Sequence, residues 1–154
     1  MKKFELTGEF ITNIFGKKLF RIRALVAFGN VEAGEFGGYV EKEENLSDDG
    51  NAWVYGNAQV YGNAWVSGNA QVSGNAQVYG NEDLIQITGL GTVHRTTTAF
   101  RTPKGIFISC GCFYGDLDSF RKQVKRTRGG KVEQEYLAFA DLIDIYFDKE
   151  ESGR

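Results

Sequence analysis

Six-residue repeats between Asn51 and Gly80 constrain the fold of this chain more than any other feature. Five of them follow one another without interruption: NAWVYG, NAQVYG, NAWVSG, NAQVSG and NAQVYG. Within each repeat, small and aliphatic residues alternate with polar or aromatic ones, and this period of two is typical of a β-strand. The Gly-Asn pair at each junction tolerates the positive φ angles of a tight corner. Four residues per strand leave no room for a hairpin, so we expect the chain to turn in the same sense every six residues.

The spacing within the repeats resembles that of the hexapeptide-repeat proteins, in which an aliphatic residue is followed four positions later by a small one. Here Val54 is followed by Ala58, and the pattern recurs in the next repeats. The resemblance implies a left-handed parallel β-helix, with three repeats in each triangular coil and coils stacked about 4.8 Å apart. The resulting 18-residue offset places Val54 on Val72 and Val66 on Leu84.

The repeats alone are too short to form a stable unit, because only a little over two coils fit and both open ends need caps. We therefore predict a mainly β fold: a short left-handed parallel β-helix with an N-terminal β cap and a C-terminal ββαα α+β cap. The expected boundaries are 1–44 for the N-terminal cap strands and an irregular first coil, 45–88 for the hexapeptide-repeat β-helix, and 89–154 for the α+β C-terminal domain.

The sequence after Gly89 indicates two strands followed by two helices. The strands are expected over 92–102 and 105–112, joined by a Thr-Pro-Lys-Gly turn. The first helix is expected to end near Arg128, before a Gly-Gly pair. The second is expected over 132–147, with an apolar stripe on one side.

Two stretches also resemble uncharacterised proteins of bacteriophages and bacteria. They are GGYVEKEENLSDDGNAWVYGNAQV, which leads into the repeats, and TTTAFRTPKGIFISCGCFYGDLDSFRKQV in the C-terminal part. Some proteins of this kind are described as acyltransferase-like or polymer-forming. The resemblance implies a protein of phage or mobile-element type, and it fixes no biochemical activity.

Charge is distributed in blocks, although the formal net charge of the chain is only −2. Net charges are +4 over 1–30, −8 over 31–90, +6 over 91–130 and −4 over 131–154. Such blocks favour self-association or an oppositely charged partner. The alternative is that the blocks neutralise one another within the fold.

The aromatic residues of the repeats are predicted to point outward, on a surface whose repeats carry no charge. Trp and Tyr are favoured anchors of protein interfaces, and an exposed aromatic band usually marks a contact surface. We expect a homo-oligomer, a dimer or trimer, that associates through these residues, unless the caps cover them. The predicted partner or self-interface consists of Trp53, Tyr55, Tyr61, Trp65 and Tyr79.

A basic surface in the C-terminal domain is the candidate site for an anion. The hairpin contributes Arg95, Arg101 and Lys104, and the first helix contributes Arg121 and Lys125. These cations could hold the phosphate of a nucleotide or nucleic acid. However, the sequence contains no recognised nucleic-acid-binding motif, and its overall pI is acidic. A solvated face, or a surface neutralised by a second copy, is the alternative.

Residues typical of metal or catalytic sites are sparse. Cys110 and Cys112 with the single His94 would be a weak metal-binding signal, and two small buried residues are the more ordinary interpretation of the cysteines. Asp141, Asp144 and Asp148 recur on one helical face and are expected to be solvated. Hexapeptide-repeat acyltransferases typically use a His in or beside the coils, and these repeats contain none. We therefore predict no metal site, no cofactor, no catalytic residues and no enzymatic activity.

These observations favour a non-enzymatic interaction protein of phage or mobile-element type. Its expected partners are a second copy of itself and a host protein, with inhibition of a host defence protein, anti-CRISPR-like or anti-immune, as the expected role. One alternative is a sponge that binds an anionic nucleotide signal at the basic C-terminal domain, and another, disfavoured, is an acyltransferase-like enzyme.

No apolar run approaches the ~18 residues of a membrane span, and the N-terminus does not resemble a signal peptide. The expected location is the cytoplasm, that of the host cell if the protein is phage-encoded.

Overall fold

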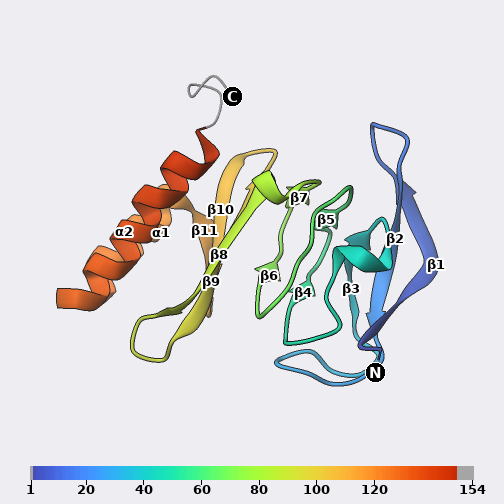
Figure 1. The fold of residues 1–154 in the computed structure, drawn as a ribbon, viewed down its shortest axis with the longest axis horizontal. Helices are drawn as coiled ribbons and strands as arrows, with labels where there is room; N and C mark the ends of the chain where they lie inside the picture. Colours follow the sequence, from blue (N-terminus) through green and yellow to red (C-terminus); the bar gives the residue numbers. More distant parts are fainter. Residues whose placement is uncertain (1, 149–154) are drawn as a thin grey trace.

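The repeats form short parallel strands, and longer antiparallel strands lie on both sides of them (Figure 1). The computed structural model describes residues 2–148. In chain order the elements are β1 (Phe4–Thr12), β2 (Lys18–Ala24), β3 (Phe36–Val40), η1 (Glu43–Asn45), β4 (Trp53–Val54), β5 (Gln59–Val60), β6 (Gln71–Val72), β7 (Gln77–Val78), η2 (Asn81–Asp83), β8 (Leu84–Leu90), β9 (Arg95–Thr102), β10 (Gly105–Cys110), β11 (Phe113–Asp116), α1 (Leu117–Thr127) and α2 (Gly130–Phe147).

The strands belong to three sheets. A five-stranded sheet has the order β1-β2-β3-β5-β7, antiparallel from β1 to β3 and parallel from β3 to β7. The strands β4 and β6 form a two-stranded parallel sheet. The C-terminal sheet is antiparallel, with the order β11-β10-β9-β8. Both helices cover one face of the C-terminal sheet, and the repeats lie against its other face (Figure 1).

The predicted left-handed parallel β-helix is therefore wrong as the class of this fold. The repeat strands are only two residues long, and the antiparallel strands at the two ends contain most of the strand residues. Each repeat strand is interrupted at its corner, where glycines such as Gly56 and Gly62 adopt φ angles of 60° and 66°. The flanking strands have no corner every six residues, so they provide most of the hydrogen-bonded ladders and divide the molecule into mixed and antiparallel sheets.

The predicted stacking of the repeats holds in its middle part and fails at its end. Val54 pairs with Val72, as the 18-residue offset predicts, and the valines of β5 and β7 pair in the same register. Leu84 was expected on Val66, but it begins β8 and pairs with Phe100 of β9. The turn η2 ends the repeats directly before Leu84. An eight-residue partner strand then offers this segment a longer ladder than another two-residue strand could.

Small residues allow the interior of the repeats to close tightly. Gly38 of β3 lies so near the repeats that a Cβ atom there would be 2.6 Å from the carbonyl oxygen of Ala58, closer than real Cβ atoms approach. The alanine and valine side chains of the repeats are buried throughout, at Ala52, Val54, Ala58, Val60, Ala64, Val66, Ala70, Val72, Ala76 and Val78.

The C-terminal part contains the two predicted helices and a larger sheet than predicted. The expected hairpin is present as β9 and β10, and β8 and β11 add one strand at each edge. Asp116 caps α1, because its carboxylate accepts a hydrogen bond from the backbone N–H of Ser119 at 2.8 Å. The sheet is joined to the repeats through Gln71. Its side-chain oxygen accepts from the Ser109 hydroxyl at 3.2 Å, and its backbone N–H donates to the Thr98 hydroxyl at 3.3 Å.

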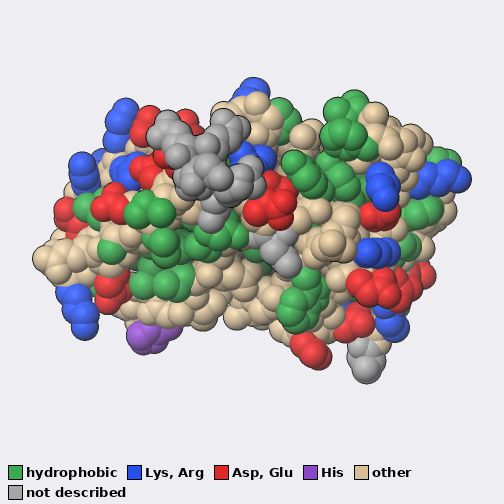
Figure 2. Space-filling model, turned by 45° about the horizontal axis from the view of Figure 1, so that its top comes forward, with side chains coloured by type: hydrophobic (Ala, Val, Ile, Leu, Met, Phe, Trp, Pro, Cys, Tyr) green, Lys and Arg blue, Asp and Glu red, His purple; other side chains and the backbone are tan. Residues whose placement is uncertain are grey.

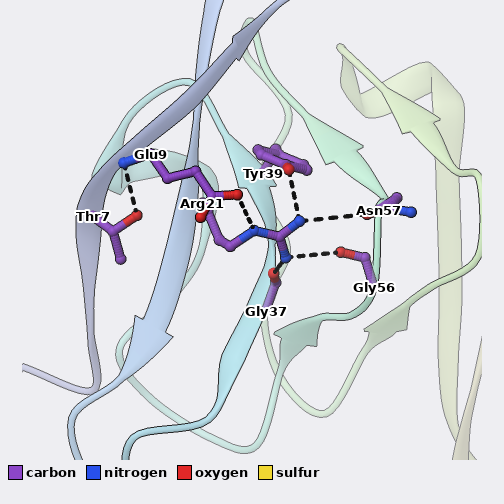
Figure 3. A network of polar contacts seen from close by, with 7 residues as sticks. All are labelled: Thr7, Glu9, Arg21, Gly37, Tyr39, Gly56 and Asn57. Carbon is purple, nitrogen blue, oxygen red and sulfur yellow. Dashed lines mark hydrogen bonds and ion pairs between the residues drawn. The ribbon is translucent and has the colours of Figure 1, made fainter.

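Arg21 of β2 joins the N-terminal hairpin to the repeats (Figure 3). Its guanidinium donates hydrogen bonds to the carbonyl oxygen of Gly37 and to the Tyr39 hydroxyl, both at 2.6 Å, and it forms an ion pair with Glu9 at 3.0 Å. The same group donates to the side-chain oxygen of Asn57 at 3.4 Å, at a corner of the repeats. Arg21 thus connects all three N-terminal strands to one corner.

Replacing Val72 with Asp should destabilise the protein by at least about 3 kcal/mol, because a carboxylate would be buried in the repeat interior without a partner. Urea unfolding followed by circular dichroism measures this change. Gln77→Glu is the matched control, since Gln77 lies in the equivalent repeat strand with an exposed side chain, and it should change stability by less than about 0.5 kcal/mol. Similar small losses in the two variants would contradict the interior position of Val72.

Arg21→Met should lower the free energy of unfolding by about 1.5–3 kcal/mol, because it removes charge-assisted hydrogen bonds to partly buried acceptors. Glu9→Gln should cost less than about 1 kcal/mol, since the Glu9 side chain is 60% exposed and exposed ion pairs contribute little. Urea unfolding of both variants compares the two effects. An equal loss in both would mean that the ion pair, rather than the contacts with Gly37 and Tyr39, provides the stabilisation.

Candidate functional site

A cavity of about 250 Å³ lies between the C-terminal sheet and the two helices. Three local features surround it: the start of β9 at Arg95, the turn between β10 and β11, and the residue that follows α1, Arg128. We call this cavity the Arg95–Arg128 pocket. Its lining residues are Arg95, Cys110, Cys112, Phe113, Phe120, Gln123, Val124, Thr127, Arg128 and Tyr136.

Two guanidinium groups face this pocket without an acidic partner. Within residues 2–148, neither Arg95 nor Arg128 forms an ion pair, and no Asp or Glu is among the lining residues. The Nε atom of Arg95 is buried and has no hydrogen-bond partner in this part of the chain. The Arg128 guanidinium lies over the Tyr136 ring, 5.8 Å from the ring centroid. Because the ring carries no net charge, this contact does not neutralise the positive charge of Arg128. Because a buried N–H without an acceptor is costly, the pocket is suited to an anion.

Gly111 allows Arg95 to reach the pocket. This glycine lies in the turn between β10 and β11 with a φ angle of 59°. A side chain at this position would overlap the Arg95 guanidinium. Any other residue would therefore adopt an unfavourable backbone conformation and also displace the arginine.

The inner wall of the pocket is aromatic. Phe120 of α1 lies edge-on to Phe113 and to Tyr136, with ring centroids 5.5 and 5.9 Å apart. This packing fixes both helices against the sheet and gives the cavity an apolar floor below the two cationic groups. The pocket can therefore accept an anion that carries a small apolar portion.

The phenol of Tyr136 is a neutral polar group in this wall. Burial raises its pKa, the adjacent Cys110 raises it further, and the guanidinium groups of Arg128 and Arg95 oppose this rise. The hydroxyl donates a hydrogen bond to the carbonyl oxygen of Leu90 at 3.4 Å. At neutral pH Tyr136 therefore keeps its proton, and the positive charge of the pocket is not cancelled by a phenolate.

Two of the cations predicted to bind an anion already have acidic partners. Arg101 forms an ion pair with the buried Asp83 at 2.7 Å. Arg121 bridges to Asp141 at 2.9 Å and to Asp144 at 2.8 Å. The predicted anion site is thus not one surface, because carboxylates from η2 and α2 neutralise two of its three arginines.

The two predicted lysines lie outside the Arg95–Arg128 pocket. Lys104 is exposed beside a shallow cavity that also contains Arg121 and Asp144, and Lys125 is exposed on α1. Figure 2 shows Lys and Arg side chains interleaved with Asp and Glu over the helical end of the molecule. Of the five predicted anion-binding residues, only Arg95 faces the pocket.

Trp53 does not lie on an outer face, and its prediction as an exposed interface anchor is wrong. It is fully buried. Its ring packs edge-on against Phe28 and Phe4, with centroids 5.3 and 6.4 Å away. The N-terminal strands cover this side of the repeats, so the large ring becomes the centre of the core that joins them.

The other predicted interface residues differ in exposure. Tyr55 is half-buried, and Tyr61 is buried against Tyr79, with which its ring stacks at a centroid distance of 5.4 Å. Trp65 and Tyr79 remain 57% and 47% exposed. Two of the five predicted anchors are therefore available on the surface of this chain.

The described residues contain no group of three or more His, Cys, Asp or Glu placed to hold a metal ion. Cys110 and Cys112 are free thiols, and the sulfur of Cys110 accepts a hydrogen bond from the Thr97 hydroxyl at 3.2 Å. The His94 ring is 3.0 Å from the carbonyl oxygen of Gly89, within its own turn. His94 and Cys110 thus make separate hydrogen bonds, each with a different partner.

The anion site expected from the sequence omitted several polar residues of the pocket, among them Gln123, Arg128 and Tyr136. The sequence does carry a signal for Arg128, because its spacing places it on the same helical face as Arg121 and Lys125. Tyr136 and Gln123 had no comparable signal, since each is an ordinary helical residue until the two helices pack together.

Comparison with known proteins finds no family model that matches this chain and no curated protein that is similar to it. Neither helix of the described part has the length and apolar composition that crossing a membrane requires.

Proposed function

We propose that this chain is a non-enzymatic binding protein that takes up a phosphate-bearing small molecule in the Arg95–Arg128 pocket. The observation that carries the proposal is the pair of guanidinium groups that face the pocket with no acidic partner among the described residues. Guanidinium groups bind phosphate and carboxylate oxygens through paired, charge-assisted hydrogen bonds.

The charge of the pocket favours a phosphate monoester over a carboxylate. A phosphate monoester carries about −1.5 to −2 charges near pH 7, whereas a carboxylate carries one. Two uncompensated guanidinium groups therefore match the phosphate better. The side-chain amide of Gln123, which also lines the pocket, adds a further hydrogen-bond donor.

The protein should bind phenyl phosphate, and the ligand should raise its melting temperature, because a ligand that binds only the folded state stabilises it. Arg128→Ala should weaken binding by about 10- to 100-fold, the effect expected of losing one charge-assisted contact. Isothermal titration calorimetry measures the affinities, and differential scanning fluorimetry measures the melting temperatures.

Lys125→Ala is the matched control for Arg128→Ala, since it removes the same charge from an exposed position on α1 outside the pocket. It should leave the affinity within about twofold of the original protein. Equal weakening in the two variants would mean that the ligand responds to overall charge. No binding of phenyl phosphate at millimolar concentration would overturn the proposal.

We further propose that the chain self-associates through the part of the repeats that carries Trp65 and Tyr79. The specific observation is that these two aromatic side chains stay about half exposed, whereas the other aromatic residues of the repeats are buried or half-buried. Exposed Trp and Tyr on an otherwise uncharged surface are favoured contact residues.

Light scattering at micromolar concentration should therefore give the mass of a dimer or trimer. Trp65→Asp should shift the protein toward the monomer, because a desolvated carboxylate opposes burial of the contact. Gln77→Glu, which adds a charge at another exposed repeat position, is the control for charge alone. A monomer before any substitution would contradict self-association.

A further inference from the structure

A second cavity of about 270 Å³ lies on the other side of Arg95, between the repeats and the C-terminal sheet. It is rich in side-chain amides and contains one aromatic ring. We call it the amide pocket, and its lining residues are Gly29, Asn30, Asn51, Tyr55, Asn69, Gln71, Arg95, Thr96 and Gly111.

The amide pocket and the Arg95–Arg128 pocket share Arg95. Gly111, which lines the amide pocket, lies in the chain between Cys110 and Cys112, which line the Arg95–Arg128 pocket. The absence of a side chain at Gly111 leaves room for the Arg95 guanidinium between the two pockets. Each cavity alone is smaller than the ~300 Å³ at which small-molecule sites begin, whereas the two together lie within the usual range. One ligand that passes Arg95 would therefore have a site of ordinary size.

The amide pocket has unused hydrogen-bonding capacity. Within residues 2–148, the side-chain amides of Asn30 and Asn51 take part in no hydrogen bond. The Gln71 side chain uses its oxygen to accept from Ser109, and its NH₂ group has no partner in the same range. These groups offer both donors and acceptors without charge, beside the half-buried ring of Tyr55.

We infer that the ligand is a nucleoside monophosphate whose phosphate lies in the Arg95–Arg128 pocket and whose base lies in the amide pocket. A nucleobase carries donors and acceptors on its edge and an aromatic face for stacking. It is also uncharged, and Arg95 is the one charged residue that lines the amide pocket. This inference rests on the proposed function, because the proposed function supplies the position of the phosphate. Arg95 would contact the ligand at the junction of the two parts.

The test is isothermal titration calorimetry of the full chain with four ribonucleoside 5′-monophosphates, ribose 5-phosphate and inorganic phosphate. At least one nucleotide should bind 10-fold or more tightly than ribose 5-phosphate. Asn30→Ala and Tyr55→Leu, which removes the stacking ring, should weaken binding of that nucleotide about three- to tenfold and leave the affinity for inorganic phosphate unchanged. Arg128→Ala should weaken both ligands. Asn30 lies at the surface in a short turn, so its replacement should preserve the fold.

The outcomes separate this inference from the function on which it rests. If ribose 5-phosphate binds as tightly as all four nucleotides, the base has no site and the inference is wrong, although phosphate binding stands. If Asn30→Ala and Tyr55→Leu weaken binding of inorganic phosphate as much as binding of the nucleotide, the amide pocket makes no separate contact with the base, and the inference is again wrong. If neither phosphate nor any nucleotide binds, the proposed function itself fails.

Discussion

The parallel stacking of the repeat strands is the constraint on which the other parts of the structure depend. Backbone hydrogen bonds hold this register, for example from the N–H of Tyr55 to the carbonyl oxygen of Val72 at 2.7 Å and from Tyr61 to Val78 at 2.8 Å. The register buries alanine and valine side chains in a narrow interior that tolerates only small residues. Because the interior is narrow, the repeats bury too little surface to be stable alone, and both ends must be covered by other strands.

The two coverings attach through different chemistry. On the N-terminal side, burial of Trp53 against Phe4 and Phe28 supplies a large apolar contact, and Arg21 adds hydrogen bonds to backbone carbonyls. On the C-terminal side the contact includes polar groups, with Gln71 held by Ser109 and Thr98. This polar contact leaves amides and a cavity beside β9, whereas on the N-terminal side the Trp53 ring is fully buried.

Acidic side chains determine which cations remain available for a ligand. Arg101 and Arg121 bind carboxylates supplied by η2 and α2, so their charge is used within the fold. Arg95 and Arg128 lie at the one end of the C-terminal sheet where the described chain offers no such partner. The candidate site is therefore a local excess of positive charge in a protein whose net charge is slightly negative.

The sequence by itself determined the two helices and the presence of basic residues in the C-terminal part, because these follow from local periodicity and composition. Its resemblance to hexapeptide-repeat proteins also predicted the register of the middle repeats. It misjudged the fold class, since the repeat pattern does not reveal how much of the chain forms antiparallel ladders. Only the tertiary structure decided that Trp53 is buried, that Leu84 pairs with Phe100 and that Arg95 and Arg128 line one pocket. These outcomes depend on contacts between residues far apart in the chain. Which apolar side chains become buried and which cations find a carboxylate is decided by those distant contacts, so the local sequence carries no signal of the result.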